Sequence, residues 1–183
     1  MLLTEKKRAT IEDYERLPEG APYQLIAGEL IMSPSPTRFH QDISGVIEFA
    51  LKLFIIPRDL GKIYDAPLDV ELTDTDVYQP DILFIRKERL SLLQGDRIDI
   101  APDLVIEILS PSTAYYDLKH KKEVYYQSGV QEYWIVDPAD ESIEIMVRDK
   151  EYYRTESLLR KTGVLQSPMF PGFSMKVEEV FVF

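Results

Sequence analysis

The chain of 183 residues contains no cysteine. This absence excludes disulfides, thiolate zinc sites and cysteine nucleophiles, and it is compatible with a reducing compartment, so we expect a cytoplasmic protein. Histidine is scarce as well, with only His40 and His120 present. Two separated histidines without cysteine do not make a zinc site.

Long apolar runs are also missing. No stretch approaches the ~20 apolar residues that a membrane helix needs, and the N-terminal MLLTEKKRAT lacks the apolar core of a signal peptide. We therefore expect no membrane contact. The sequence also has no GxxxxGK[ST], GxGxxG or GxSxG motif, which disfavours a phosphate-binding loop, a dinucleotide site and a serine hydrolase.

A positive net charge is the third absence, since the formal charge is −11. This argues against a protein that coats nucleic acid through a basic surface. It does not exclude an enzyme that acts on phosphodiesters, because carboxylates that bind divalent cations make the empty site acidic.

The composition is otherwise that of a globular protein, with 45% hydrophobic and 29% charged residues. The length predicts one domain over residues 1–183. The hydrophobic period changes several times along the chain, which predicts helices at residues 10–17, 37–55 and 113–128, and strands at 23–32, 66–72, 79–85, 103–109, 132–137, 142–147 and beyond 151. This order predicts an α/β fold, with a mixed central β-sheet flanked by helices.

Glu107 is the most informative acidic residue, because it lies inside the apolar run LVIEIL at residues 104–109. An ionised carboxylate in a buried strand is costly unless it is paired, protonated or bound to a metal. A structural carboxylate paired with Lys or Arg is one interpretation. A functional carboxylate is favoured, because perturbed charges gather at functional sites.

Asp81 opens the expected strand 79–85 directly after a proline. A Pro-Asp pair is also common at turns, and a second such pair ends in Asp103. Asp103 precedes Glu107 by four residues on one strand, about 13 Å away at ~3.3 Å per residue, which is too far to share a metal. Asp81 lies on a different strand that could run beside Glu107, so Asp81 is preferred.

Lys121 falls on the apolar stripe of the expected helix 113–128. Residues of this stripe recur at helical spacing: Ala114, Asp117, Leu118, Lys121, Val124, Tyr125 and Ser128. The stripe should face the sheet and bring Lys121 with it. Four polar residues fall on the outer side and should be solvated, namely Lys119, His120, Lys122 and Glu123. An ordinary Asp117–Lys121 helix pair, with the ammonium in water, remains an equal alternative.

Glu29 and His40 give weaker signals. Glu29 lies in the apolar run LIAGELIM and could offer an oxygen to a divalent cation or line an exposed strand face. His40 lies one turn into the helix 37–55, where a surface position is the more frequent explanation.

Several stretches together resemble the Uma2 family of the PD-(D/E)XK nuclease superfamily. They cover most of the chain from about residue 10 to the end: YQLIAGEL, Pro80-Asp81, APDLVIEILSPST, Asp117 with Lys121, and GVQEYWIVDP. The resemblance implies a restriction-endonuclease-like fold with a carboxylate-bound divalent metal. Asp81 then matches the aspartate of the motif, Glu107 its acidic residue, and Glu29 a glutamate supplied near the N-terminus.

The chain departs from the superfamily pattern at two positions. The motif lysine should follow Glu107 by two residues, but Leu109 is there. The family draws its lysine from the following helix, and Lys121 is the residue at that place. Gln24 stands where relatives often have glutamate.

These residues predict a metal-dependent endonuclease that hydrolyses phosphodiester bonds in nucleic acid, with DNA as the expected substrate. The oxygen ligands of Asp81, Glu107 and Glu29 suit Mg²⁺ or Mn²⁺, and Lys121 would act electrostatically. A homodimer is an open expectation. One alternative is a catalytically inactive nuclease-fold binding module; another is a glycosidase-like hydrolase with two carboxylates.

Overall fold

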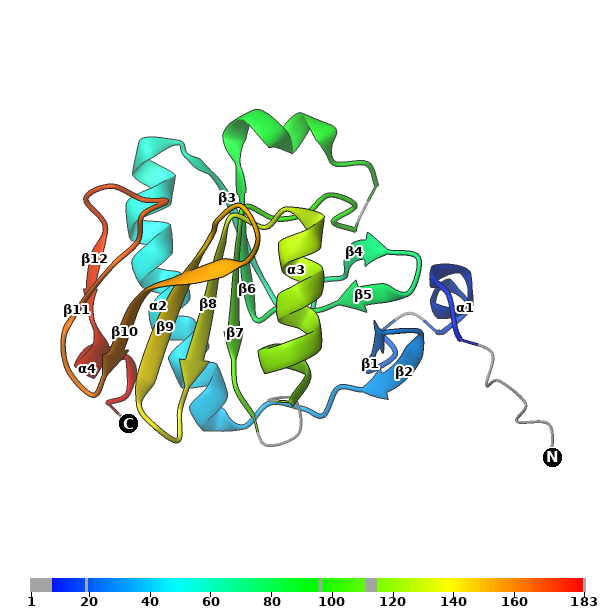
Figure 1. Ribbon diagram of the computed structural model, residues 1–183, viewed down its shortest axis with the longest axis horizontal. Helices are drawn as coiled ribbons and strands as arrows, with labels where there is room; N and C mark the ends of the chain where they lie inside the picture. The colour runs from blue at the N-terminus through cyan, green and yellow to red at the C-terminus, as the bar shows by residue number, and fades with distance from the viewer. Residues whose placement is uncertain (1–7, 19, 96, 111–114, 183) are drawn as a thin grey trace.

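The computed structural model describes residues 8–18, 20–95, 97–110 and 115–182 (Figure 1). Its centre is a six-stranded sheet in the order β10-β9-β8-β7-β6-β3. Strands β7 and β8 are parallel and the other neighbours antiparallel, so the predicted α/β fold with a mixed central sheet is confirmed. The strands are β3 Gly61–Asp65, β6 Ile82–Arg86, β7 Leu104–Ile108, β8 Glu132–Asp137, β9 Ser142–Arg148 and β10 Tyr153–Arg160.

The expected strand at residues 103–109 is β7, and all five of its residues are buried. It lies between β6 and β8, so it occupies an interior position in the sheet. Alternate residues point to opposite faces of a strand: Ile106 joins the apolar cluster on one face, and Val105 joins the cluster on the other. A near-continuous apolar sequence is what such two-sided burial requires.

One face of the sheet is covered by α2, Arg38–Ile55 (Figure 1). The Thr37 hydroxyl accepts the His40 N–H at 3.2 Å and so caps the helix at the start that the sequence predicts. Every fourth residue of α2 is fully buried: Ile43, Ile47, Leu51 and Ile55. The C-terminal elements pack into the same cluster: β11 Val164–Gln166, β12 Ser174–Lys176 and α4 Val177–Val180.

The other face is covered by a helix that begins as a π-helix, η3 Tyr116–Lys121, and continues as α3 Lys122–Ser128. It ends at Gly129, whose φ of 99° is left-handed, directly after the expected helix end at residue 128. The expected start at residues 113–114 lies outside the described residues. Leu118 is 47% exposed, so its predicted burial is wrong, because the wider π turn moves it off the 3.6-residue period.

A second, four-stranded sheet lies beside α3. It is antiparallel in the order β2-β1-β5-β4 and carries α1 on its outer side (Figure 1). These elements are α1 Ile11–Glu15, β1 Tyr23–Ile26, β2 Glu29–Met32, β4 Val70–Thr73 and β5 Asp76–Tyr78. The run at residues 23–32 predicted either a pair of strands or one strand bent at Gly28, and the structure has the pair, as the hairpin β1–β2. A Cβ at Gly28 in its turn would meet the Arg8 Cβ at 2.7 Å, so the close approach requires glycine there.

The structure corrects the expected strand at residues 66–72. The strand begins only at Val70 and belongs to the small sheet, while β3, which the periodicity did not reveal, forms the edge of the central sheet. Two short 3₁₀ segments complete the fold, η1 Ile56–Arg58 and η2 Lys87–Leu92. Within the described parts of the chain, no helix is long and apolar enough to span a membrane.

Candidate active site

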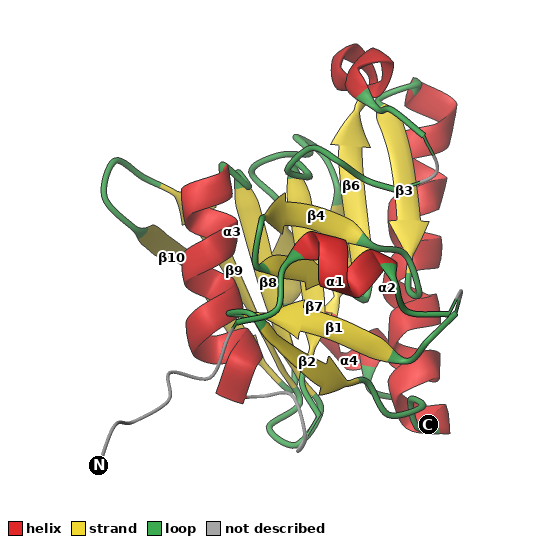
Figure 2. Cartoon of the chain, turned by 90° about the vertical axis from the view of Figure 1, so that its right-hand side faces the viewer, coloured by secondary structure: helices red, strands yellow, loops and turns green. Residues whose placement is uncertain are grey.

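A cleft of about 670 Å³ lies where the small sheet meets the central sheet and the start of α2. Figure 2 shows hairpin β1–β2 between α3 and α2, in front of the central sheet. The polar side chains that line the cleft come from several elements: Gln24, His40, Gln79, Asp81, Glu107, Ser110 and Lys121. Prolines and small residues of the connecting loops make up much of the remaining wall.

Asp81 lies directly before β6, as the sequence predicts. Strand β6 pairs with β7 so that Ile82 is opposite Ile106, and one further step in this register brings Asp81 opposite Glu107. The Asp81 Oδ2 accepts the Ile108 backbone N–H at 2.6 Å. Asp81 is therefore held at the end of β7 beside Glu107, as a shared site requires. Directly opposed residues on neighbouring strands have Cβ atoms about 5 Å apart.

Glu107 is 3% exposed and points to the α3 side of β7. Its Oε1 accepts the Tyr125 hydroxyl at 2.6 Å and the Lys121 ammonium at 3.1 Å. Burial raises the pKa of Tyr125 well above its usual value, and the charge of Glu107 raises it further. Tyr125 therefore remains a neutral donor that fixes the carboxylate.

Lys121 is 2% exposed, so its ammonium points inward, as predicted. The ammonium pairs with Glu107 and lies 5.6 Å from the ring centroid of Tyr78. Both contacts favour the charged ammonium in a buried position. The alternative in which Lys121 reaches water is wrong, and the side chain of Asp117 lies outside what the structure describes.

His40 contributes more to the cleft than its sequence position suggests. Its Nε2 lies 3.3 Å from the Asp81 Oδ1. Burial lowers the His40 pKa, but the hydrogen bond and charge of Asp81 outweigh it, and the net pKa is raised. His40 is therefore poised to hold Asp81 from one side while Ile108 holds it from the other. The signal was available in the sequence, because the first turn of a buried helix follows the loop at residues 33–37.

Glu29 is not brought to this cleft. It is exposed on β2 and is not among the residues that line the cavity. Gln24 on the neighbouring strand is buried and does line it. The Gln24 side chain accepts the Gln79 N–H at 3.0 Å and donates to the Ser33 hydroxyl at 2.9 Å. The hairpin thus presents an amide to the cleft where the sequence analysis expected the carboxylate of Glu29.

A second polar network, centred on Asp76 of β5, was not anticipated. The Asp76 Oδ1 accepts the Tyr78 hydroxyl at 2.6 Å, and the His120 Nε2 lies 2.9 Å away. The helical spacing predicted a solvated His120 on the outer side of the helix. That prediction is wrong, because His120 contacts Asp76. Hydrogen bonds outweigh the burial of Asp76 and lower its pKa. This network fastens η3 to the small sheet and so helps to place Lys121, the next residue.

Asp103, the competing Pro-Asp carboxylate, lies elsewhere. It is buried but accepts the Arg86 backbone N–H at 2.9 Å, and the Arg89 guanidinium lies 3.0 Å from it. These are the contacts of a structural ion pair at the opposite end of β7. The preference for Asp81 over Asp103 in the cleft agrees with the structure.

The carboxylate oxygens in the cleft suit a hard divalent cation that takes only a few of its ligands from the protein. Among the described residues, no group of three or more His, Asp or Glu side chains is placed to hold a metal. Mg²⁺ does not require such a group, because it keeps several waters and binds through one or two carboxylates and substrate phosphates. Asp81 and Glu107 provide two carboxylates in one cleft.

Comparison with known proteins gives one family and one structural likeness. The model of a family described as "Uma2: Putative restriction endonuclease" matches residues 11–178. A crystal structure of "a putative nuclease belonging to DUF820" from Anabaena variabilis has a TM-score of 0.81 and 21% identity, and the match covers 94% of this chain and 97% of that one. At this identity the likeness shows the fold. No curated protein matches the sequence.

Proposed function

Because the chain belongs to the Uma2 family, we propose that it is a metal-dependent endonuclease, with a single nuclease-like domain, that hydrolyses phosphodiester bonds in DNA. The observation that carries the proposal is the buried Lys121–Glu107 pair at 3.1 Å, in the cleft that Asp81 also lines. The family membership supports nuclease chemistry in general. The metal, the substrate and the roles of these residues are proposed from the side chains in the cleft.

Asp81 and Glu107 are the proposed metal ligands, and Mg²⁺ or Mn²⁺ is the ion that their oxygens suit. When bound, such an ion offsets phosphate charge and promotes the attack of water. The protein's part is to fix the two carboxylates before the substrate arrives. Ile108 and His40 fix Asp81, and Tyr125 and Lys121 fix Glu107.

Lys121 is proposed to stabilise the negative charge that develops on the phosphate, or to orient the attacking water. Its neighbour Glu107 favours the charged ammonium, which suits electrostatic stabilisation and does not suit a general base. Leu109 occupies the place of the usual motif lysine. Lys121 reaches the Glu107 carboxylate from η3. The inward position of its ammonium supports the proposal that Lys121 takes the role of the motif lysine.

The test is cleavage of labelled single- and double-stranded DNA and RNA while Mg²⁺ or Mn²⁺ is titrated. We expect cleavage of DNA that requires the cation and stops with excess chelator. Cleavage that persists unchanged in chelator would contradict the proposal. Metal-independent binding of nucleic acid without any cleavage would favour the inactive binding module instead.

A second copy of the chain is the proposed protein partner, through the outer face of α2. Phe49, Leu53 and Ile56 follow one another at helical spacing and are 64%, 60% and 64% exposed, which is unusual for a face in water. Gly45 continues the stripe, and a Cβ added at this position would meet no atom within 4 Å. An antiparallel crossing of two α2 helices would set Ile56 of each copy against Gly45 of the other.

The same crossing would bring Asp42 near Arg58 of the second copy, so the rim charges are complementary. Light scattering of the wild-type protein should give the mass of a dimer, and Leu53→Glu should give a monomer with an unchanged circular dichroism spectrum. A monomeric wild-type protein at micromolar concentration would contradict this interface.

A further inference from the structure

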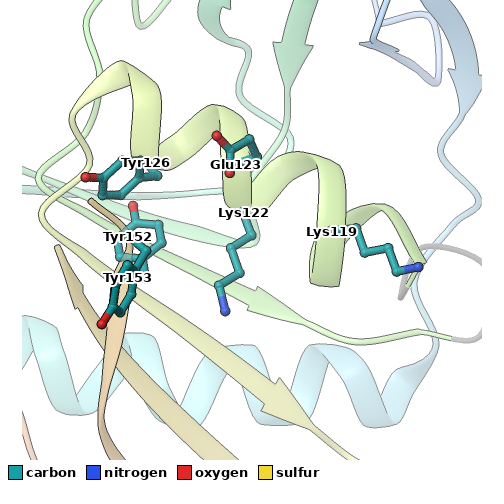
Figure 3. Close-up of a pocket in the computed structure, with 6 residues that line it drawn as sticks. All are labelled: Lys119, Lys122, Glu123, Tyr126, Tyr152 and Tyr153. Atoms are coloured by element: carbon teal, nitrogen blue, oxygen red, sulfur yellow. The ribbon is translucent and has the colours of Figure 1, made fainter. Parts of the chain in front are cut away.

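The outer side of η3 and α3, opposite Lys121, carries a second cavity of about 320 Å³. Figure 3 shows its six lining residues, with three tyrosines gathered at one end, Lys119 at the other and Lys122 between them. The tyrosines are Tyr126 of α3, Tyr152 before β10 and Tyr153 in β10. This cavity does not share a lining residue with the cleft.

The two lysines of this surface differ from the residues between them in their ionic contacts. Among the described residues, no ion pair includes Lys119 or Lys122, whereas the intervening His120 and Lys121 are paired with Asp76 and Glu107. The cavity also has a carboxylate, Glu123, which accepts the side-chain amide of Gln127 along the helix at 2.7 Å. On a chain with a net charge of −11, two neighbouring ammonium groups mark a place where an anionic ligand can bind.

Aromatic rings accompany the cations along the whole surface. The Lys119 ammonium lies 5.1 Å from the ring centroid of Tyr115, which is 66% exposed. At the other end, the Arg148 guanidinium lies 4.7 Å from the ring centroid of Tyr126. Tyr152 beside it is 63% exposed. The exposed rings of Tyr115 and Tyr152 are therefore available to stack on a ligand, and Tyr152 lines the same cavity as Lys119 and Lys122.

We propose that this surface, formed by Tyr115, Lys119, Lys122, Tyr126, Arg148 and Tyr152, binds single-stranded nucleic acid. Alternating cations and exposed aromatic rings are the combination that binds a strand, because ammonium groups meet phosphates and rings stack on bases. Only bases that are not already stacked in a duplex can use exposed rings in this way. A duplex keeps its bases stacked and would gain only the phosphate contacts, which a net charge of −11 does not favour.

The dimensions suit a short length of strand. Tyr126 follows Tyr115 by eleven positions, which is at most about 16 Å along the helix at the ~1.5 Å rise of an α-helical residue. That length spans about three to five phosphates at the 3.4 Å spacing of a stacked strand. The same helix presents Lys121 to the cleft on its other side. A bound strand would therefore pass the helix whose inner face carries the proposed catalytic lysine, and in this sense the inference rests on the proposed function.

The test is binding of fluorescein-labelled oligo(dT) in chelator, where no metal-dependent cleavage occurs. The double variant Lys119→Ala/Lys122→Ala should weaken binding about tenfold at low salt. It should also lower the slope of log Kd against log salt by about 1.4, because each lost phosphate contact removes about 0.7. Tyr152→Leu should weaken binding about fivefold or more through lost stacking. The matched control Lys62→Ala/Lys161→Ala removes the same charge from exposed positions elsewhere and should bind as the wild type does.

Cleavage assays separate this inference from the proposed nuclease activity. With single-stranded substrate, the double variant should raise KM and leave kcat unchanged. If the wild-type protein never cleaves but the variants lose oligo(dT) binding, the surface is supported and the nuclease proposal fails. If wild-type cleavage depends on Glu107 while the variants keep the wild-type Kd and KM, the surface is overturned. Equal losses in the control variant would also overturn it, because general charge would then explain the binding.

Discussion

Two glutamates, Glu107 and Glu132, lie buried on the neighbouring parallel strands β7 and β8, at 3% and 2% exposure. Glu107 points to the α3 side, where its oxygen meets an ammonium and a tyrosine hydroxyl in an open cleft. Glu132 is hydrogen-bonded to uncharged donors, the indole N–H of Trp134, the Ser167 hydroxyl and the Met169 N–H, at 2.6, 2.6 and 2.9 Å. Burial alone does not distinguish the two carboxylates.

The partners and the access of each carboxylate do distinguish them. Glu132 binds the C-terminal segment to β8, and three donors from the protein satisfy it without any ligand. Glu107 faces a cavity and shares it with a second carboxylate, Asp81, so the negative charge there exceeds what Lys121 alone can balance. A buried carboxylate is therefore a functional candidate when a cleft and an excess of like charge accompany it.

The largest expected effect is that of Glu107→Gln on cleavage. Glutamine keeps the shape of the side chain and an oxygen for the Tyr125 hydroxyl, but it removes a charged metal ligand. We expect kcat to fall about 10³-fold, the upper range for the loss of one electrostatic partner in an active site. Single-turnover cleavage at saturating Mg²⁺ measures the effect, and thermal unfolding checks that the fold persists. If Glu107→Gln cleaves at the rate of the wild type, Glu107 takes no part in the reaction.

Glu132→Ala should lower the stability of the fold and leave the cleavage rate nearly unchanged. It leaves the Trp134 indole N–H and the Met169 N–H without their acceptor, so the free energy of unfolding should fall by roughly 3 kcal/mol. The value of kcat should stay within about twofold of the wild type, since Glu132 lies on the other face of the sheet. Urea unfolding and cleavage of the same samples give both quantities. A large fall in kcat in a variant that remains folded would erase the distinction between the two glutamates.

The pH dependence of that stability gives a further check on Glu132. Burial raises its pKa above the ordinary value of 4.5, although hydrogen bonds from Ser167 and Trp134 lower it. The folded protein therefore holds this proton to a higher pH than the unfolded chain does. The resulting stabilisation is complete below pH 4.5 and is lost as the pH rises through the folded pKa. As the pH rises from 4.5 through the folded pKa of Glu132, the difference in unfolding free energy between the wild type and Glu132→Ala should narrow. A difference that widens with rising pH would contradict a raised pKa of Glu132.

Lys121→Met should reduce cleavage by about 10²-fold, the usual scale for losing one charge that stabilises a transition state. Methionine fills most of the buried volume, so the variant tests the charge more cleanly than alanine would. Metal affinity, measured by calorimetry, should be largely kept. Lys62→Ala, which removes an exposed lysine of β3, is the control. An unchanged rate for Lys121→Met with metal bound would exclude Lys121 from the mechanism.

The smallest expected effect is that of Glu29→Gln. Glu29 is exposed on β2 and does not line the cleft, so kcat and metal affinity should both stay within about twofold of the wild type. That range is typical for a surface substitution away from a functional site. A loss of metal binding comparable to that of Glu107→Gln would show that the hairpin supplies a ligand after all.

Apolar periodicity predicted most of the fold. The buried strand β7 follows from a near-continuous apolar run, and helix α2 follows from apolar residues three or four positions apart. The run at residues 23–32 predicted strand without deciding between a hairpin and one bent strand. Strand β3 was missed because its sequence, GKIYD, forms a half-buried sheet edge with little alternation. Leu118 was misplaced because nothing in the spacing announces the π turn of η3. Such a turn is selected by tertiary contacts such as that of His120 with Asp76.

Residues of the candidate site were predicted in two ways: Asp81 from its place before a strand and from the family resemblance, and the other two from a conflict with their surroundings. Glu107 and Lys121 are charged residues at apolar positions, and that conflict identifies them in the sequence. Gln24 and His40 lie at positions where polar residues are ordinary, so their place in the cleft emerged only from the packing of the hairpin and α2. Glu132 begins its strand and therefore shows no conflict in the sequence, although it is as buried as Glu107.

The most direct test of the central claim is a crystal of the protein soaked in Mn²⁺ and measured at the manganese absorption edge. The account predicts an anomalous peak within about 2.0–2.6 Å of carboxylate oxygens from both Asp81 and Glu107. A parallel crystal of Glu107→Gln should lose most of that peak. A manganese ion at Glu29, at Glu132 or nowhere in the cleft of the saturated wild-type crystal would contradict the proposed metal site.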